Sequence, residues 1–107
     1  MRLKYIFSLL VFVGAIAHGK AIGNYPTIQL DQLPESLRAQ WAMLKPEMTQ
    51  MSHCATAFDS HSDGDKMAFR CSIHIKMSAE GERRAMSYCE EKRAEKKIHM
   101  PCKLIEE

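Results

Sequence analysis

The chain has 107 residues, of which 46% are hydrophobic and 26% are charged, and its formal net charge is +2. This length suits one small domain, and the near balance of charge provides no bulk attraction to nucleic acid or to an anionic membrane surface. We therefore expect neither as a partner, although a local basic patch remains compatible with these counts.

The first 17 residues have the features of a secretory signal peptide. Arg2 and Lys4 precede an apolar run that ends in the small-residue pattern Ala15-Ile16-Ala17. The run has about 13 residues, fewer than the roughly 20 that cross a bilayer. We expect cleavage after Ala17, or as late as residue 21, a single exported domain over residues 18–107 and no membrane span after cleavage. Loss of Arg2 and Lys4 would leave 13 basic residues against 13 acidic ones.

A helix is predicted after an extended leading segment. Residues 18–27 contain glycine and proline without periodicity and predict no element. Pro34 then suits a first helical turn, and Pro46 predicts a kink or two short helices, 34–44 and 46–52. The apolar side chains that recur at helical spacing are Leu37, Trp41, Leu44, Met48 and Met51.

The next pattern predicts a β-hairpin. Apolar and polar side chains alternate over residues 67–77, which is typical of a strand with one buried face and one solvated face. Residues 54–58 predict its partner strand, and residues 59–65 are rich in turn formers. Pairing Cys54 with Cys71 puts the apolar side chains of both strands on one face. The same register sets Thr56 against Phe69 and Phe58 against Met67.

A second helix and a short strand complete the predicted fold. Ser78 is suited to cap a helix over residues 79–97, which has acidic residues near its start and basic ones near its end. Pro101 stops the helix, and residues 102–105 predict a closing strand. The predicted inward face of the helix consists of Ala79, Met86, Cys89 and the stem of Arg93. The expected class is α+β: a small disulfide-stabilised domain with a leading amphipathic helix, a β-hairpin, a second helix and a short C-terminal strand.

Four cysteines in an exported chain indicate two disulfides. The hairpin favours Cys54 with Cys71, and a strand that follows the second helix favours Cys89 with Cys102, while the other two connectivities stay open. The spacing lacks the close Cys-x-x-Cys pairs of zinc sites, so disulfides are preferred to zinc.

Candidate partner-binding residues are Arg70, His74 and Lys76, which share the polar face of the predicted long strand. The chain has no Gly-rich phosphate loop, nucleophile elbow or His-Glu-x-x-His motif, so we assign no catalytic residue and no cofactor. The predicted function is that of a secreted or periplasmic, non-catalytic protein that binds another protein, as an inhibitor, immunity factor or accessory subunit does.

Two other functions remain open. Thioether and imidazole groups suit Cu(I), and a copper site would use Met48, Met51, His53 and, if cleavage follows Ala17, the new amino terminus at His18. Methionines at helical spacing more often fill a core. The third function, a small secreted hydrolase, requires two of the histidines to converge with a carboxylate or lysine in one cleft. The carboxylates of residues 59–65 do not match a calcium-binding loop and suit a turn.

Overall fold

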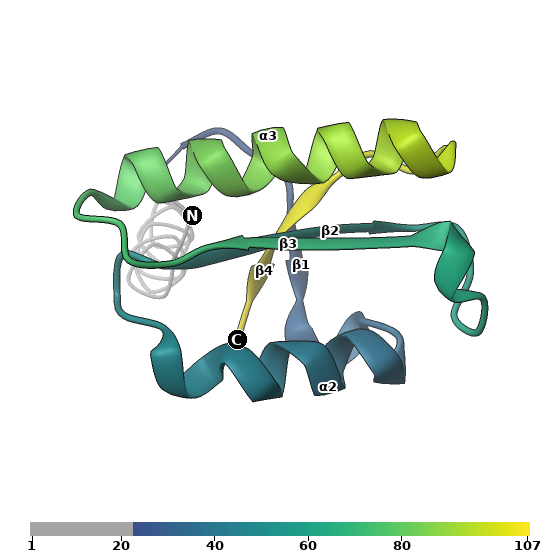
Figure 1. Cartoon of the computed structure of the whole chain (residues 1–107), viewed down its shortest axis with the longest axis horizontal. Helices are drawn as coiled ribbons and strands as arrows, with labels where there is room; N and C mark the ends of the chain where they lie inside the picture. The colour runs from purple at the N-terminus through teal and green to yellow at the C-terminus, as the bar shows by residue number, and fades with distance from the viewer. Residues whose placement is uncertain (1–22) are drawn as a thin grey trace, which may run out of the picture.

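The computed structural model describes residues 23–107. The predicted signal peptide, the cleavage region and His18 lie outside the described residues. Residues 23–107 contain two α-helices and four strands, which confirms the α+β class. The sheet lies between helix α3 (Ser78–Lys96) on one face and helix α2 (Glu35–Leu44) on the other (Figure 1). No helix in this part of the chain is long and apolar enough to cross a membrane.

The sheet has the strand order β1-β4-β2-β3. Its strands are β1 (Thr27–Gln29), β2 (His53–Phe58), β3 (Met67–Ser72) and β4 (Lys103–Glu106). β1 pairs parallel with β4, whereas β2 pairs antiparallel with both β4 and β3. The predicted hairpin register is confirmed, because Cys54 lies opposite Cys71, Thr56 opposite Phe69 and Phe58 opposite Met67. Single 3-10 turns follow β1, follow α2 and precede β3, at Leu30–Gln32, Lys45–Glu47 and Gly64–Lys66.

Strand β1 was not predicted. Residues 18–27 were expected to lead directly into a helix, but β1 begins at Thr27 and precedes that helix. The strand has three residues, too few to show a period of two. It exists because the C-terminal strand lies beside it, with the amide of Leu104 donating to the carbonyl oxygen of Pro26 at 2.9 Å. Helix α2 is therefore the first helix but not the first element.

The prediction of a helix over residues 46–52 is also wrong. Helix α2 ends at Leu44, and Pro46 lies within the 3-10 turn, since proline cannot donate to a continuing helix. Leu37 is buried against the sheet, whereas Met51 is 37% exposed and belongs to no helix. Of the predicted apolar stripe only Leu37 is fully buried, whereas Trp41, Leu44 and Met48 are half-buried.

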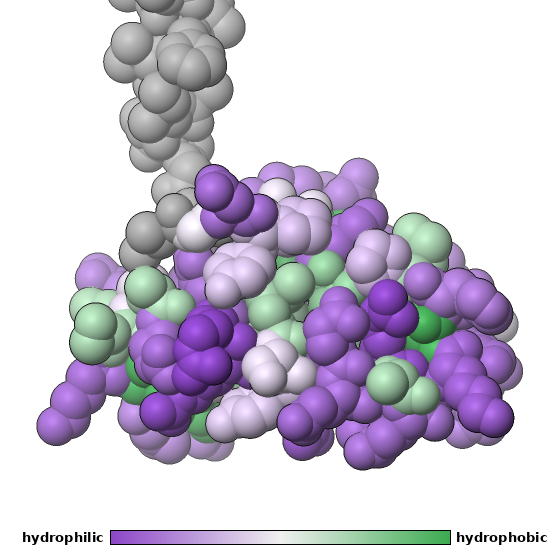
Figure 2. All heavy atoms as spheres, turned by 90° about the horizontal axis from the view of Figure 1, so that it is seen from above, coloured by the Kyte–Doolittle hydropathy of each residue, from purple (hydrophilic) through white to green (hydrophobic). Residues whose placement is uncertain are grey.

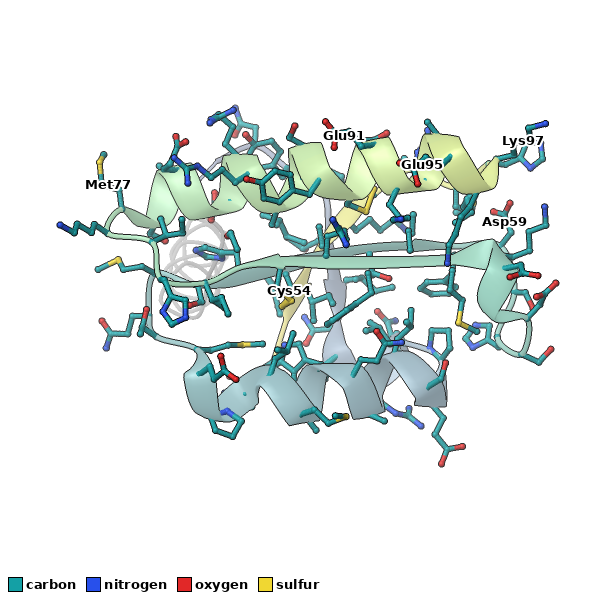
Figure 3. All side chains as sticks on the ribbon, in the orientation of Figure 1. Cys54, Asp59, Met77, Glu91, Glu95 and Lys97 are labelled. Carbon is teal, nitrogen blue, oxygen red and sulfur yellow. A yellow bond between two sulfur atoms is a disulfide. The ribbon has the colours of Figure 1, made fainter. Side chains whose placement is uncertain are left out.

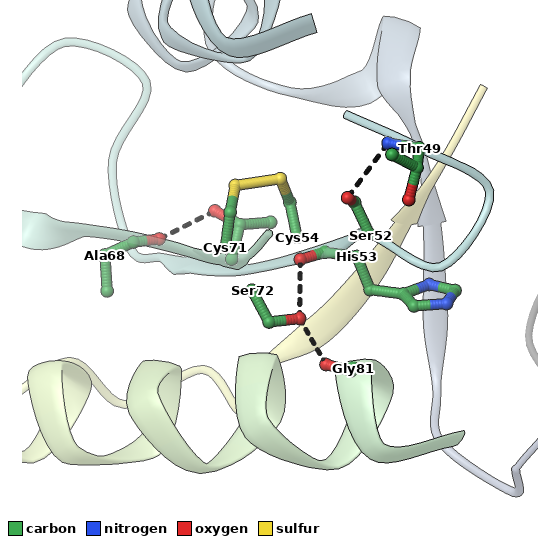
Figure 4. The surroundings of a disulfide bond; sticks show 9 residues. Thr49, Ser52, His53, Cys54, Ala68, Cys71, Ser72 and Gly81 are labelled. Atoms are coloured by element: carbon green, nitrogen blue, oxygen red, sulfur yellow. Dashed lines mark hydrogen bonds between the residues drawn. A yellow bond between two sulfur atoms is a disulfide. The ribbon is translucent and has the colours of Figure 1, made fainter. Parts of the chain in front are cut away.

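The long strand ends five residues earlier than predicted. Strand β2 begins at His53, which lies opposite Ser72, so the chain beyond Ser72 has no residue of β2 to pair with. Residues 73–77 form a loop in which His74 has a left-handed φ of 61°. The Ser72 hydroxyl donates to the carbonyl oxygen of Gly81 at 2.6 Å and ties the end of β3 to α3 (Figure 4).

Both faces of the sheet are covered, which corrects the expectation of one solvated face. Ala68 and Ser72, assigned to that solvated face, are buried. The cluster between the sheet and α3 consists of Ala55, Ala57, Ala68, Ala85, Cys89, Ile98, Cys102 and Leu104. The cluster on the α2 side consists of Leu33, Leu37 and Met67, with partly buried apolar neighbours that include Phe58 and Phe69. The outer surface seen over α3 is largely hydrophilic (Figure 2).

The predicted inward face of helix α3 is confirmed in part, because Cys89 is buried and Met86 packs against the core. The buried residues of α3 are Gly81, Glu82, Ala85 and Cys89, whereas Ala79 is exposed. Ser78 is the first helical residue and does not cap the helix. The buried carboxylate of Glu82 accepts a hydrogen bond from the amide of Gly23 at 2.9 Å and so holds the start of the described chain against α3.

The two disulfides are Cys54–Cys71 and Cys89–Cys102, the pairs that the sequence geometry favoured (Figure 3). The first joins β2 to β3 with Cα atoms 3.9 Å apart, and the second joins α3 to the residue before β4 with Cα atoms 6.2 Å apart. All four cysteines are used. Structural disulfides persist in oxidising compartments, so they indicate a place for the folded chain outside the reducing cytoplasm.

Candidate partner-binding edge

Strand β3 forms one edge of the sheet. It is hydrogen-bonded to β2 on one side, and within residues 23–107 no strand pairs with its other side. In Figure 1 it lies in front of β2, with α3 above it and α2 below it. An edge strand presents unpaired backbone donors and acceptors, which makes it a place where another chain can pair.

Backbone groups of β3 alternate between the β2 side and the open side. The carbonyl oxygen of Lys66 accepts a hydrogen bond from the residue that follows β2, at 2.9 Å. The next carbonyl oxygen, that of Met67, instead accepts from the Lys96 ammonium at 2.7 Å and so faces away from β2. By the same alternation, the amide and carbonyl groups of Phe69 and Cys71 face the open side. The close approach of the bridged cysteines agrees, since it is typical of a pair that exchanges no backbone hydrogen bonds.

A groove of about 310 Å³ follows this edge between the two helices. Its walls come from three elements and the turn before β3: Ser36, Leu37 and Gln40 of α2, Lys92 and Lys96 of α3, Met67, Phe69 and Arg70 of β3, and Gly64. The groove therefore has both polar and apolar walls on the α2 side and a basic wall on the α3 side.

The three basic side chains of the groove differ in their hydrogen-bond and ion-pair partners. Lys96 donates to the carbonyl oxygens of Gly64 and Met67, which occupies one end of the edge. Lys92 forms an ion pair with Glu95 at 3.1 Å. Arg70 is exposed, and its guanidinium has no hydrogen bond or ion pair with any described residue. It is the groove cation that is free to meet a partner's carboxylate.

The sequence pattern predicted that His74 and Lys76 share a strand face with Arg70. This prediction is wrong, because β3 ends at Ser72. His74 and Lys76 are instead exposed in the loop of residues 73–77, which follows the open edge toward α3. The sequence therefore identified three exposed residues along one stretch of chain, of which the structure places only Arg70 on the sheet.

Three histidines of residues 23–107 are held by different partners and do not form the cluster that a hydrolase would need. His53 Nε2 lies 2.7 Å from the Ser78 hydroxyl, His61 packs edge-on against Phe58, and His99 lies 3.2 Å from Asp59. Burial lowers the pKa of His53, an effect that the nearby carboxylate of Glu82 opposes.

The candidate copper ligands among the described residues are only partly brought together. Met48 and His53 both line a second groove, of about 520 Å³, beside Trp41 and the C-terminal residues, but Met51 does not. Within residues 23–107 no group of three or more His, Cys, Asp or Glu side chains is arranged to hold a metal ion. The acidic loop has a structural role, since Asp63 accepts from the amide of Asp65 at 2.9 Å.

The contribution of α3 to this edge was not predicted from the sequence. Lys92 and Lys96 are spaced by four residues and so share one helix face, but nothing local indicates that this face flanks β3. No protein-family model matches the chain, and no curated protein and no solved structure is significantly similar to it.

Proposed function

We propose that this is a secreted or periplasmic, non-catalytic protein that binds another protein through its β3 edge. We define the β3 edge as the open backbone of Phe69 and Cys71 together with the side chains of Arg70, Lys92 and Lys96. The observation that carries the proposal is the unpaired guanidinium of Arg70 beside an unpaired strand edge. Binding to a protein satisfies both kinds of group at once.

Rigidity supports a binding role of the inhibitor, immunity or accessory-subunit kind. The Cys54–Cys71 bridge fixes β3 to β2 directly behind the edge, and Ser72 is fixed to α3 at the end of the strand. A surface that is already ordered loses little conformational entropy when a partner binds. His74 and Lys76 are exposed just beyond the edge, and in this proposal they extend the contact.

Site-specific photo-crosslinking in the producing cell tests the proposal. A photoreactive amino acid replaces Arg70, His74 or Lys76, and in a matched control it replaces Arg38, an exposed arginine of α2 outside the groove. We expect one adduct of the same mass from position 70 and from at least one loop position, and none from position 38. Adducts of equal yield from position 38, or none from position 70, would refute the proposal.

A further inference from the structure

We infer that the partner contributes an extended segment that pairs with β3 as a fifth strand and sets an acidic side chain against Arg70. This inference deepens the proposed function and rests on it. It specifies how the partner is held, by main-chain hydrogen bonds, and which side chain it must carry.

The open backbone of β3 defines the length of segment that fits. Phe69 and Cys71 each offer one amide and one carbonyl group to the open side, while Met67 uses its amide within the preceding turn and its carbonyl with Lys96. Four hydrogen bonds at a spacing of two residues require a partner segment of roughly five residues in extended conformation. Lys96 closes one end of this site, so pairing begins at Phe69 and runs toward the loop.

The charge of the edge favours an acidic side chain on the segment. Arg70 has no ion pair with any described residue, Lys96 lies beside it in the groove, and Glu95 on α3 is engaged by Lys92. Opposite charges on neighbouring strands stabilise pairing, and like charges oppose it. A glutamate or aspartate across from Arg70 is therefore favoured over a neutral or basic residue.

A second copy of this chain is a poor occupant of the same edge. In an antiparallel pair of β3 strands that uses all four open groups, Phe69 of each copy lies opposite Cys71 of the other. That register places the two Arg70 side chains directly opposite each other, which is destabilising. The arginine thus disfavours self-pairing and favours an acidic segment from a different protein.

Two capped peptides of seven residues test the inference with the intact oxidised protein, one of alternating valine and glutamate and one of alternating valine and lysine. Amide hydrogen exchange is followed by NMR at about 1 mM peptide. This concentration detects binding that is much weaker than in a typical protein complex. We expect the glutamate peptide to slow exchange at Phe69 and Cys71, and the lysine peptide to have no effect. N-methylation of the glutamate peptide on its pairing edge should abolish the protection.

Charge reversal provides the matched variant. Arg70→Glu should weaken binding of the glutamate peptide about fivefold or more, the factor that corresponds to one partly exposed ion pair, and should improve binding of the lysine peptide. Arg38→Glu should change neither. Protection outside β3, equal binding of both peptides, or absence of protection by the glutamate peptide would overturn the inference.

Two alternatives to strand addition predict different experimental results. If Arg70 serves only to prevent edge pairing, Arg70→Thr will dimerise in sedimentation experiments and neither peptide will protect β3, which also overturns the inference. If position 70 crosslinks to a partner in the cell but the peptide measurements fail, the proposed function stands and strand addition does not.

Discussion

Gly81 lies where α3 closely approaches the loop that precedes β2. A Cβ atom at this position would overlap the carbonyl oxygen of Met51 and lie 3.1 Å from the His53 ring and 3.3 Å from the Ser72 hydroxyl. The first of these neighbours is backbone and cannot rotate away. The absence of a side chain at position 81 is thus what allows the helix to receive the hydrogen bond from Ser72.

Gly81→Ala should therefore destabilise the fold although alanine favours helices. We expect a loss of about 1–3 kcal/mol in the free energy of unfolding, the range for overpacking a tight contact. Urea denaturation followed by circular dichroism measures it. Gly64→Ala is the matched control, because a Cβ there meets no atom within 4 Å, and it should change stability little. Equal stability of the two variants would contradict this account of Gly81.

Asp59 ties the end of β2 to the segment that leads into β4. Its carboxylate accepts hydrogen bonds from the amides of His99, at 2.7 Å, and Met100, at 3.0 Å, and His99 Nδ1 lies 3.2 Å away. These bonds, the backbone ones first, lower the pKa of Asp59. Because the folded pKa lies below the unfolded one, the stability contributed by Asp59 is present above about pH 4 and is lost as the pH falls through the folded value.

Asp59→Asn should lower the melting temperature at neutral pH and flatten its decline on acidification, since the asparagine amide cannot replace a carboxylate that accepts from both amides. Thermal unfolding between neutral and acidic pH measures both effects. Asp31→Asn is the control, because that exposed side chain makes no hydrogen bond with any described residue. A parent protein and an Asp59→Asn variant with parallel pH profiles would show that Asp59 does not carry this linkage.

At the scale of elements, α2 is attached to the sheet by few side chains. Leu37 is fully buried there, with Leu33 and Met67 beside it, whereas Met43 on the same helix is 78% exposed. Pro34 and Pro46 bound the helix at either end and limit its length to ten residues. Its position on the sheet therefore depends mainly on one leucine.

Leu37→Ala should cost about 2–5 kcal/mol, the range for leucine truncation in a core, and should expose the α2 side of the β3 groove. Met43→Ala, a truncation of similar size at an exposed position of the same helix, should change the free energy of unfolding by less than about 0.5 kcal/mol. Urea denaturation compares the two, and hydrogen exchange of α2 amides shows whether the helix detaches locally. Similar losses in both variants would mean that the helix is held in some other way.

The elements that sequence analysis predicted are those whose pattern is local. The hairpin register followed from the alternation around Cys71 and a turn of seven residues, and the end of the first helical segment followed from Pro46. Strand β1 and the end of β3 depend on chain that is distant in sequence: β4 supplies the partner of β1, and β2 supplies none beyond Ser72. Periodicity carries no information about such pairings.

The same distinction applies to the candidate site. Arg70 was identified because an arginine in an alternating strand pattern is rarely fully buried. The burial of Ala68 and Ser72 and the approach of Lys92 and Lys96 could not be inferred, because they depend on α3 packing across the second face. The buried Glu82 was missed for the same reason, since its helix appeared solvated on most sides.

At the scale of the whole molecule, the core is made largely of small residues. The cluster under α3 includes four alanines, and the largest fully buried aliphatic side chains are Leu37 and Leu104. A domain of this size is marginal on packing alone, so covalent links between elements have a large effect on its stability. The two bridges close loops of similar length, with sequence separations of 17 and 13 residues.

Each bridge should contribute about 3 kcal/mol by restricting the unfolded chain, against a total of roughly 5–15 kcal/mol for a typical domain. The double variants Cys54→Ala with Cys71→Ala and Cys89→Ala with Cys102→Ala should therefore each remain folded with a lower urea midpoint, and the fourfold variant should be close to unfolded. The two double variants control for each other, because their loops predict nearly equal losses while only the first releases the β3 edge. If the fourfold variant kept the midpoint of the parent protein, packing of the small core would be sufficient, and the disulfides would serve to hold the edge in shape rather than to hold the molecule together.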